Sequence, residues 1–151
     1  MQISARNGSV EMLEMLLQNG GAINSRGPNG DTLFHLSALN GHVEALKWLY
    51  CNGVLPEAVD MNGPIYSSNS KMFIDMITNL TGQSAVHIAA RRGEAEVLRY
   101  LFNELGMDAG QLDFDGRTPL DCVPRKGNFD NEDDLKICRE LINTKMIASA
   151  S

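Results

Sequence analysis

Three stretches of the chain share one arrangement of apolar and polar positions. In each stretch apolar side chains recur with spacings close to i, i+1, i+4 and i+5, which places them on one face of a helix. Each stretch is therefore predicted to be an amphipathic helix that needs a partner to cover its apolar face. The stretches are residues 10–17, with Met12, Leu13, Leu16 and Leu17; residues 43–50, with Leu46, Leu49 and Tyr50; and residues 95–102, with Val97, Leu98, Leu101 and Phe102.

A short segment of small residues precedes each of these helices. Small side chains let a neighbouring helix approach closely, so each segment is predicted to be an inner helix, and glycines fit the left-handed position that ends a helix. Each unit is thus an antiparallel helix pair followed by a turn, and such units must stack to bury their apolar surface. The small pairs are Ser4-Ala5, Ser37-Ala38 and Ala89-Ala90; the glycines are Gly41 and Gly93 after first helices, and Gly20 and Gly53 after second helices.

The glycines also reveal an internal repeat. The distances from Gly30 to Gly41 and from Gly82 to Gly93 are both 11 residues (41 − 30 and 93 − 82). A third copy begins at Gly116 and continues Arg-Thr-Pro-Leu-Asp. The spacing from Gly8 to Gly41 gives a period of 33 residues (41 − 8), which is typical of repeat architectures.

The pattern G-x-T-P-L-H-x-A-A-x-x-G with this period resembles the ankyrin repeat, most clearly at Thr118-Pro119-Leu120, His35 and His87. The resemblance implies an all-α solenoid of stacked antiparallel helix pairs joined by hairpin turns, forming a single domain over residues 1–151. The expected units are 1–29 (partial), 30–62, 63–81 (degenerate and shortened), 82–115 and 116–145 (a C-terminal capping unit), followed by a frayed tail at 146–151.

The repeat breaks in the middle of the chain. Gly63 lies in register, 33 residues after Gly30 (63 − 30), but Gly82 follows only 19 residues later (82 − 63). We interpret residues 54–81 as a degenerate repeat that has lost most of its inner helix, with a single amphipathic helix remaining. The alternative is a connecting segment whose glycine falls in register by chance.

The two ends depart from the repeat as well. Met1-Gln2-Ile3-Ser4-Ala5 matches the middle of an inner helix, so the first unit has no hairpin before it, and we expect a fragment of a longer protein or a shortened form. An acidic insertion at Asp130–Asp134 precedes the last apolar stretch. Its carboxylates suit the start of a helix, whose N-terminal dipole favours negative charge.

Composition narrows the classes of partner and compartment. Thirteen Lys and Arg against 19 Asp and Glu give a net charge of −6, which argues against nucleic acid and acidic membrane as partners. No apolar run is long enough for a membrane helix or signal peptide. Cys51, Cys122 and Cys138 are odd in number and widely spaced, so a reducing compartment, cytoplasmic or nuclear, is expected.

No arrangement of residues indicates catalysis, a cofactor or a metal. His35 and His87 occupy equivalent positions, and the resemblance implies that they make structural hydrogen bonds near Thr32 and Ser84. Asp121 replaces this histidine in the last unit. Residues 113–116 match a hairpin rather than a calcium loop, because the other ligands of an EF-hand are absent.

The sequence therefore predicts a non-enzymatic module that binds a protein partner and is a monomer in isolation. The resemblance implies a concave binding face of hairpin tips and inner helices. One more specific hypothesis is an inhibitor or regulator similar to the NF-κB or cyclin-dependent kinase inhibitors, since the acidic balance would suit a basic partner segment. A second is an accessory domain of a larger enzyme or channel. A third is an independent hydrolase that relies on His87. The candidate partner-binding residues are Arg26, Asn29, Asp31, Leu39, Asn40, Gln83, Arg91, Arg92, Phe114 and Arg117.

Overall fold

The regular elements of the protein are helices throughout the part that the structure, a computed structural model, describes: residues 1–53, 82–125 and 132–150. They follow one another as short helix pairs, in agreement with the expected all-α class. The helices are α1 (Gln2–Asn7), α2 (Val10–Gln18), α3 (Leu33–Leu39), α4 (Val43–Cys51), α6 (Ala85–Arg92), α7 (Ala95–Asn103), α8 (Pro119–Cys122) and α9 (Glu132–Ala150).

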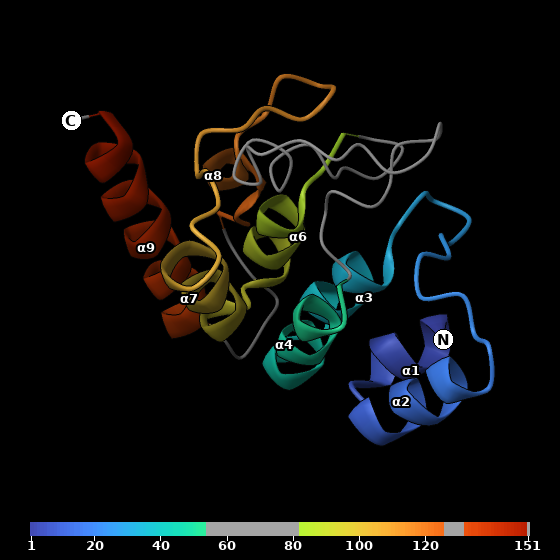
Figure 1. Cartoon of the computed structure of the whole chain (residues 1–151). Coiled ribbons are helices and arrows are strands. Elements are labelled where there is room, and N and C mark those ends of the chain that lie inside the picture. The colour runs from blue at the N-terminus through green and yellow to red at the C-terminus, as the bar shows by residue number, and fades with distance from the viewer. Residues whose placement is uncertain (54–81, 126–131, 151) are drawn as a thin grey trace.

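The helices form two layers. An inner layer runs α1, α3, α6 and α8, and each of these helices contacts the next, while α2, α4, α7 and α9 form the outer layer (Figure 1). The two termini lie at opposite ends of this row of pairs (Figure 1). The predicted solenoid of antiparallel helix pairs is confirmed.

Helices α3 and α6 contact each other directly, although residues 54–81 separate them in the chain. The unit that begins at Gly30 therefore stacks against the unit that begins at Gly82. The degenerate repeat predicted for residues 63–81 lies outside the described residues.

Small residues allow this close stacking of the inner helices. Ala5, Ser37 and Ala38 are buried where α1 meets α3, and the Ser37 hydroxyl donates a hydrogen bond to the Ala5 carbonyl across 3.2 Å. Ala89 and Ala90 are fully buried on α6. A larger side chain at these positions would separate neighbouring units.

The turn glycines differ in how much space surrounds them. Gly82 and Gly116 hold the same place in successive hairpins, with φ of +76° and +74°. A Cβ at Gly82 would lie 2.7 Å from the backbone nitrogen of Phe114 in the next hairpin, whereas a Cβ at Gly116 would have nothing within 4 Å. Gly82 is therefore required both by its left-handed backbone and by the approach of the neighbouring unit. The glycines predicted to end helices also have positive φ: Gly20, Gly41, Gly53 and Gly93.

The apolar stripes of the outer helices are buried unequally. All four members of the α7 stripe are buried, because α4 and α9 contact this helix from two sides. On α2 the expected burial of Met12 is wrong, since its side chain is 45% exposed, while Leu13 is fully buried. Tyr50 on α4 is likewise exposed rather than buried. The burial of each side chain depends on which neighbouring helices cover it, and a local sequence pattern does not contain that information.

The C-terminal helix is longer than expected. The frayed tail predicted from residue 146 is wrong for residues 146–150, because α9 continues to Ala150. The reason is spacing: Met146 follows Ile142 by four residues, as Ile142 follows Cys138, and Met146 packs against the core. The acidic residues Glu132–Asp134 form the first turn of α9, as the dipole argument predicts.

Replacing Leu101 with alanine tests the stacked core. Leu101 is fully buried, so we expect the free energy of unfolding to fall by about 2–5 kcal/mol. Leu112→Ala is the matched control, because Leu112 is 58% exposed and its loss should change stability by about 0.5 kcal/mol or less. Urea denaturation measures both, and equal losses would contradict the assigned burial.

Substitution of the two hairpin glycines separates backbone strain from close approach. Gly82→Ala and Gly116→Ala share the strain of a positive φ, but only the first also forces the Phe114 backbone to move. We expect Gly82→Ala to be more destabilising by about 1–3 kcal/mol, the usual cost of overpacking. Thermal or urea denaturation gives the difference; similar values would mean that the two hairpins do not approach as described.

Candidate functional site

His35 joins two units through both nitrogens of its ring. The Thr32 backbone N–H donates to Nδ1 at 3.2 Å, and Nε2 lies 3.1 Å from the Gln83 carbonyl oxygen, 48 residues away. A backbone N–H only donates and a carbonyl only accepts, so the ring is neutral with its proton on Nε2. The structural hydrogen bond near Thr32 agrees with what the resemblance implies, and the bond to Gln83 also makes His35 a link between the units.

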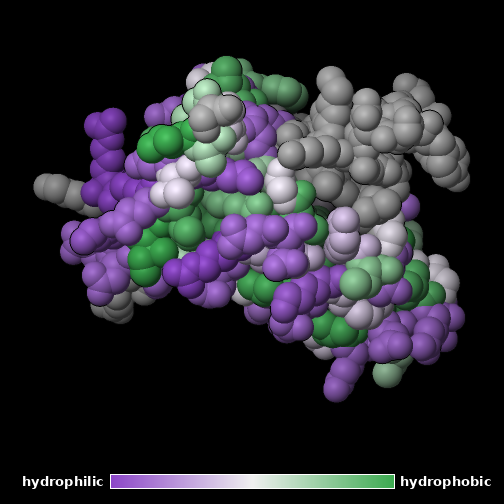
Figure 2. Space-filling model, turned by 60° about the vertical axis from the view of Figure 1, so that its left-hand side comes forward, coloured by the Kyte–Doolittle hydropathy of each residue, from purple (hydrophilic) through white to green (hydrophobic). Residues whose placement is uncertain are grey.

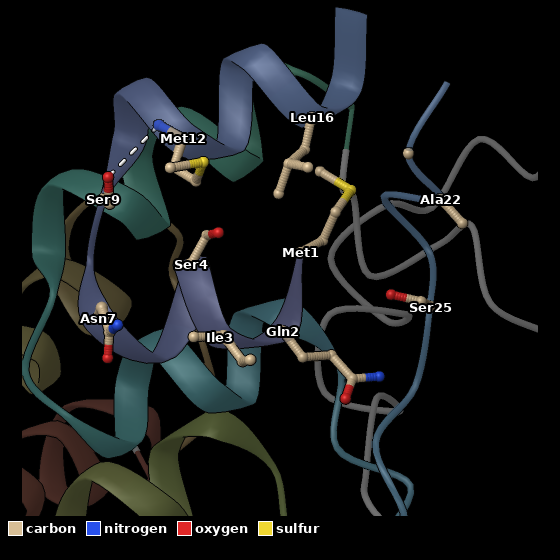
Figure 3. A pocket seen from close by; sticks show the side chains of 11 residues that line it. Met1, Gln2, Ile3, Ser4, Asn7, Ser9, Met12, Leu16, Ala22 and Ser25 are labelled. Atoms are coloured by element: carbon tan, nitrogen blue, oxygen red, sulfur yellow. Dashed lines mark hydrogen bonds between the residues drawn. The ribbon is translucent and has the colours of Figure 1, made fainter. Parts of the chain in front are cut away.

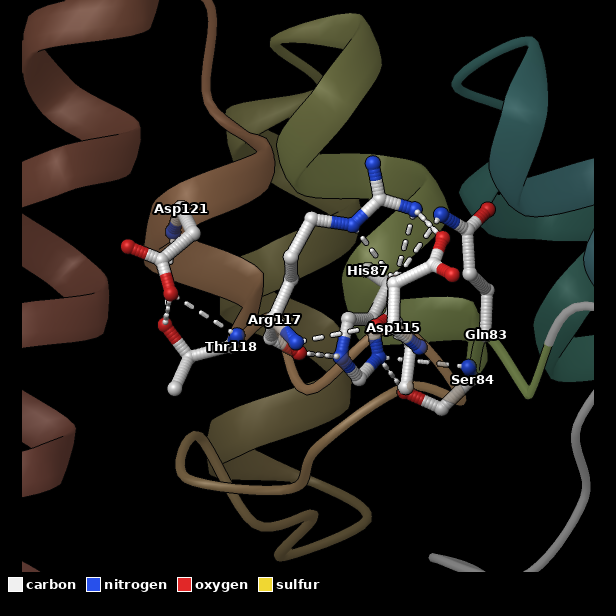
Figure 4. Close-up of polar contacts among 8 residues, drawn as sticks. Gln83, Ser84, His87, Asp115, Arg117, Thr118 and Asp121 are labelled. Atoms are coloured by element: carbon white, nitrogen blue, oxygen red, sulfur yellow. Dashed lines mark hydrogen bonds and ion pairs between the residues drawn. The ribbon is translucent and has the colours of Figure 1, made fainter.

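His87 repeats this arrangement one unit further along. Its Nδ1 accepts from the Ser84 backbone N–H at 3.2 Å, and its Nε2 donates to the Arg117 carbonyl at 3.1 Å (Figure 4). Burial lowers the pKa of the His87 imidazole below its ordinary value, and this outweighs the hydrogen bond to Arg117. A protonated ring would also turn Nδ1 into a donor facing the N–H of Ser84.

Other residues take the histidine position at the two ends of the described stack. In the first unit the Gln2 amide donates to the Arg26 carbonyl at 2.8 Å. In the last hairpin the Asp121 carboxylate accepts from the backbone and hydroxyl of Thr118, both at 3.0 Å, which lowers the pKa of Asp121. A carboxylate cannot donate onward, which fits the expectation that Asp121 belongs to a divergent last unit.

A buried carboxylate orients Arg117. The side chain of Asp113 has no exposed surface; its Oδ2 accepts from Arg117 Nε at 3.0 Å, and Gln83 Nε2 lies 3.5 Å from the same oxygen. Burial raises the pKa of Asp113, but hydrogen bonds from the backbone and side chain of Arg117 outweigh it and leave the pKa below its usual value. Asp115 also pairs with Arg117 at 2.7 Å, and Figure 4 shows the Gln83 and Arg117 side chains lying next to each other.

These residues border a hollow of about 410 Å³ on the inner-helix face. Its volume falls in the ~300–1,000 Å³ range of ligand pockets. We call it the inner groove. Its lining residues are Arg6, Asn29, Asp31, His35, Leu36, Leu39, Gln83, Ile88, Arg91 and Arg117.

The repeat register explains why these residues meet. Equivalent positions of stacked units form columns, so each column supplies one side chain per unit to the same face. Leu36 and Ile88 form an apolar column, and the other two columns are more polar. One of them, from the hairpins, contains Asp31, Gln83 and Arg117; the other, from the ends of the inner helices, contains Arg6, Leu39 and Arg91.

The inner groove contains six of the ten residues proposed from the sequence: Asn29, Asp31, Leu39, Gln83, Arg91 and Arg117. Gln83 contributes little surface there, because it is only 4% exposed.

The other four candidates are absent from the groove lining. Arg26 donates to the Gly30 carbonyl, Asn40 donates to the Arg6 carbonyl at 2.8 Å, and Arg92 donates to the Leu39 carbonyl. Phe114 is 76% exposed, next to Gly82. Three of these four therefore serve contacts within the stack.

Four groove residues were not among the candidates: Arg6, Leu36, Ile88 and His35, the last of which was assigned only a structural role. Arg6 shares its repeat position with Leu39 and Arg91, both of which were proposed, so extending the register to the first unit would have found it. Leu36 and Ile88 look like ordinary core residues from the sequence. Leu36 is only half-buried and keeps an open side in the assembled face, whereas Ile88 is 2% exposed and is indeed part of the core.

A second hollow, of about 860 Å³, lies at the N-terminal end of the stack. Met1 and Leu16 point toward each other across it, and Ile3 on α1 and Met12 on α2 also line it (Figure 3). Ile3, at the position of Leu36 and Ile88, is 76% exposed. This end of the described stack is therefore apolar and uncovered.

Apolar side chains also reach the surface elsewhere. On the face seen in Figure 2, hydrophobic residues form several groups with hydrophilic residues between them. None of the helices that the structure describes is long and apolar enough to cross a membrane. Within the same residues, no three His, Cys, Asp or Glu side chains form a group that could hold a metal ion.

Comparison with known proteins identifies the repeat. Two family models, both described as ankyrin repeats in many copies, match residues 1–50 and 73–122. The Notch-regulated ankyrin repeat-containing protein of Xenopus laevis is 32% identical over 107 residues, which cover 68% of this chain and 77% of that protein. The human protein of the same name is 31% identical over the same length.

A much longer protein is similar as well. An L-asparaginase of Dirofilaria immitis is 30% identical over 139 residues, or 83% of this chain. The chain spans only 23% of the length of that relative.

The buried His87 predicts a pH-dependent stability. Above pH ~6.5 the residue is neutral in the folded and unfolded chain alike, but as the pH falls below that value the unfolded chain binds a proton that the folded state resists. Stability should therefore decrease by up to about 1.4 kcal/mol per pH unit until the lowered folded pKa is reached.

His87→Gln removes this titration while keeping a donor, as Gln2 does in the first unit. Urea denaturation at pH 7.5 and 5.5 should show a weaker pH dependence for the variant than for the original protein. Equal pH dependence would contradict the neutral, buried state of His87.

Proposed function

The chain belongs to the ankyrin-repeat family, whose repeats form protein-interaction modules, and we propose that its inner groove is the surface that binds a segment of a protein partner. One copy of the chain would bind one partner molecule. The resemblance implies a concave binding face, and the proposal assigns binding to the residues of that face that line the inner groove.

The observation that carries the proposal is the meeting of the three columns in one hollow. The groove combines apolar surface from Leu36 and Leu39 with charged side chains such as Arg91 and Asp31 at its sides. Binding sites usually have this character, with apolar surface for affinity and a few polar groups for orientation. The repeated small residues and histidines are used in stacking, so the variable positions are those available for a partner.

We also propose that the chain has no catalytic activity of its own. In both His35 and His87, one ring nitrogen accepts from a backbone N–H and the other donates to a backbone carbonyl. A general base needs a nitrogen within reach of a substrate proton, and these nitrogens are already used.

A regulatory role follows from the same surface. A module that occupies a segment of a partner prevents other proteins from binding there, which is how an inhibitor or regulator of a transcription factor or kinase would act. We place this interaction in the cytoplasm or nucleus, since Cys51, Cys122 and Cys138 are free thiols.

A second candidate is an accessory role beside an enzyme or channel. The similarity to a fraction of the L-asparaginase supports it, because in that relative the matching region is joined to a much longer chain. An antibody against residues 82–125 would distinguish the two roles by the size of the protein that it detects in native extracts: a band near 16.5 kDa favours the independent module.

Site-specific photo-crosslinking tests the groove directly. A benzoylphenylalanine at Asn29, an exposed residue of the groove, should crosslink to a partner protein in extracts. The same group at Tyr50, an exposed aromatic on the outer helix α4, is the control and should give little of that product. Equal yields at both positions, or crosslinks from Tyr50 alone, would show that the inner groove is not the binding surface.

A further inference from the structure

We propose that the inner groove selects an acidic peptide segment, with carboxylates that reach its arginines and apolar side chains that cover Leu36 and Leu39. This inference rests on the proposed function and adds the chemical class of the partner segment. It differs from the expectation drawn from net charge, which favoured a basic segment.

The groove presents positive charge, although the chain as a whole is negative. The chain carries 13 basic and 19 acidic residues, yet the groove lining contains three arginines, Arg6, Arg91 and Arg117, and one carboxylate, Asp31. Arg117 is paired with Asp113 and Asp115, so the positive charge offered to a partner is that of Arg6 and Arg91. Local charge in a hollow guides a partner more strongly than distant surface charge, because charges beyond ~10 Å are screened at physiological salt. The groove, and not the total of −6, therefore sets the preferred charge of the segment.

Two of these arginines remain available to a ligand. The ion pairs among the described residues involve Lys47, Arg99 and Arg117, and none involves Arg6 or Arg91. Both of the latter are exposed at the ends of inner helices. A carboxylate of the partner could pair with each of them through two parallel N–H groups.

The third arginine is oriented in advance. Arg117 is held by the buried Asp113 and by Asp115, while half of its side chain, 48%, stays exposed. The two carboxylates outweigh the single positive charge of Arg117, so Arg117 contributes a planar donor in a fixed orientation and no net positive charge. A side chain ordered before binding loses less entropy when the partner arrives.

The apolar surface of the groove sets the second requirement. It comes from Leu36 and Leu39 on α3, which are half-buried, whereas Ile88 on α6 lines the groove but is only 2% exposed. In an extended segment successive side chains point to opposite sides, so alternating residues could place apolar side chains on Leu36 and Leu39 and acidic ones near the arginines. A fully charged polyanion would leave the apolar surface uncovered.

A random peptide library displayed on phage, selected on the full chain, tests this inference without a known partner. Bound peptides are sequenced and their affinities measured by fluorescence polarisation on the original chain and two double variants. Arg6→Glu with Arg91→Glu reverses the groove charge. Arg125→Glu with Lys136→Glu makes the same charge change at exposed residues outside the groove lining and is the matched control.

We expect the selected peptides to be enriched in Asp and Glu among apolar residues. Their affinity should fall about tenfold in the groove variant, the change that follows from losing two exposed ion pairs and meeting repulsion instead, and should remain unchanged in the control. Circular dichroism of each variant establishes that the fold is retained.

The other outcomes contradict the inference in distinguishable ways. Neutral or basic peptides whose binding still depends on the groove would overturn the acidic class and leave the proposed function standing. Peptides that bind both double variants equally well, or no selected peptide at all, would overturn both. Competition of the peptides by a single-stranded oligonucleotide of equal charge, at equal affinity, would show a general polyanion site and also overturn the proposal.

Discussion

The contact between α3 and α6 is the interaction on which the rest of the structure depends. It brings together two units separated by residues 54–81, and it is fixed by small buried residues and by the hydrogen bond from the His35 ring to the Gln83 carbonyl. The inner groove is formed by residues of both units. Without this contact, Leu36 and Leu39 would not lie beside Ile88 and Arg91, and the apolar column would be divided.

Hydrogen bonds of the same kind recur along the stack, each directed from one unit toward the next. A neutral ring or an amide near the start of α1, α3 and α6 donates to the backbone of the next hairpin, from Gln2 to Arg26, from His35 to Gln83 and from His87 to Arg117. These bonds hold in place the backbone of the residues whose carbonyls accept them. Two of them, Gln83 and Arg117, also line the groove, so stacking and the candidate binding surface share the same residues.

Much of the fold could be predicted from the sequence because equivalent positions of the repeat have similar surroundings in each unit. Glycine spacing, small inner residues and apolar outer stripes predicted the helix pairs. The histidine position predicted the hydrogen bonds to Thr32 and Ser84, but not the bonds to the next unit. Burial depends on neighbours that a local pattern does not contain, which is why Met12 and Tyr50 are exposed and why α9 extends to Ala150.

The candidate site was only partly predictable for a related reason. Hairpin and helix-end positions indicated six of its residues, whereas Arg26, Asn40 and Arg92 bind backbone carbonyls within the stack. Leu36 resembles a core residue until the assembled face shows its open side, and Ile88, which also lines the groove, is a core residue. The charge of the groove was not predictable from composition, because the columns gather arginines from units that are far apart in the chain.

The most direct test of the account is the state of the His35 ring in solution, measured by nuclear magnetic resonance on labelled protein at pH 7.5. We predict a neutral ring with its proton on Nε2, slow exchange of that proton with water, and nuclear Overhauser effects from the ring to the backbone of residues 83 and 84. A rapidly exchanging ring proton with no such effects would show that the two units do not meet, and the inner groove would not exist.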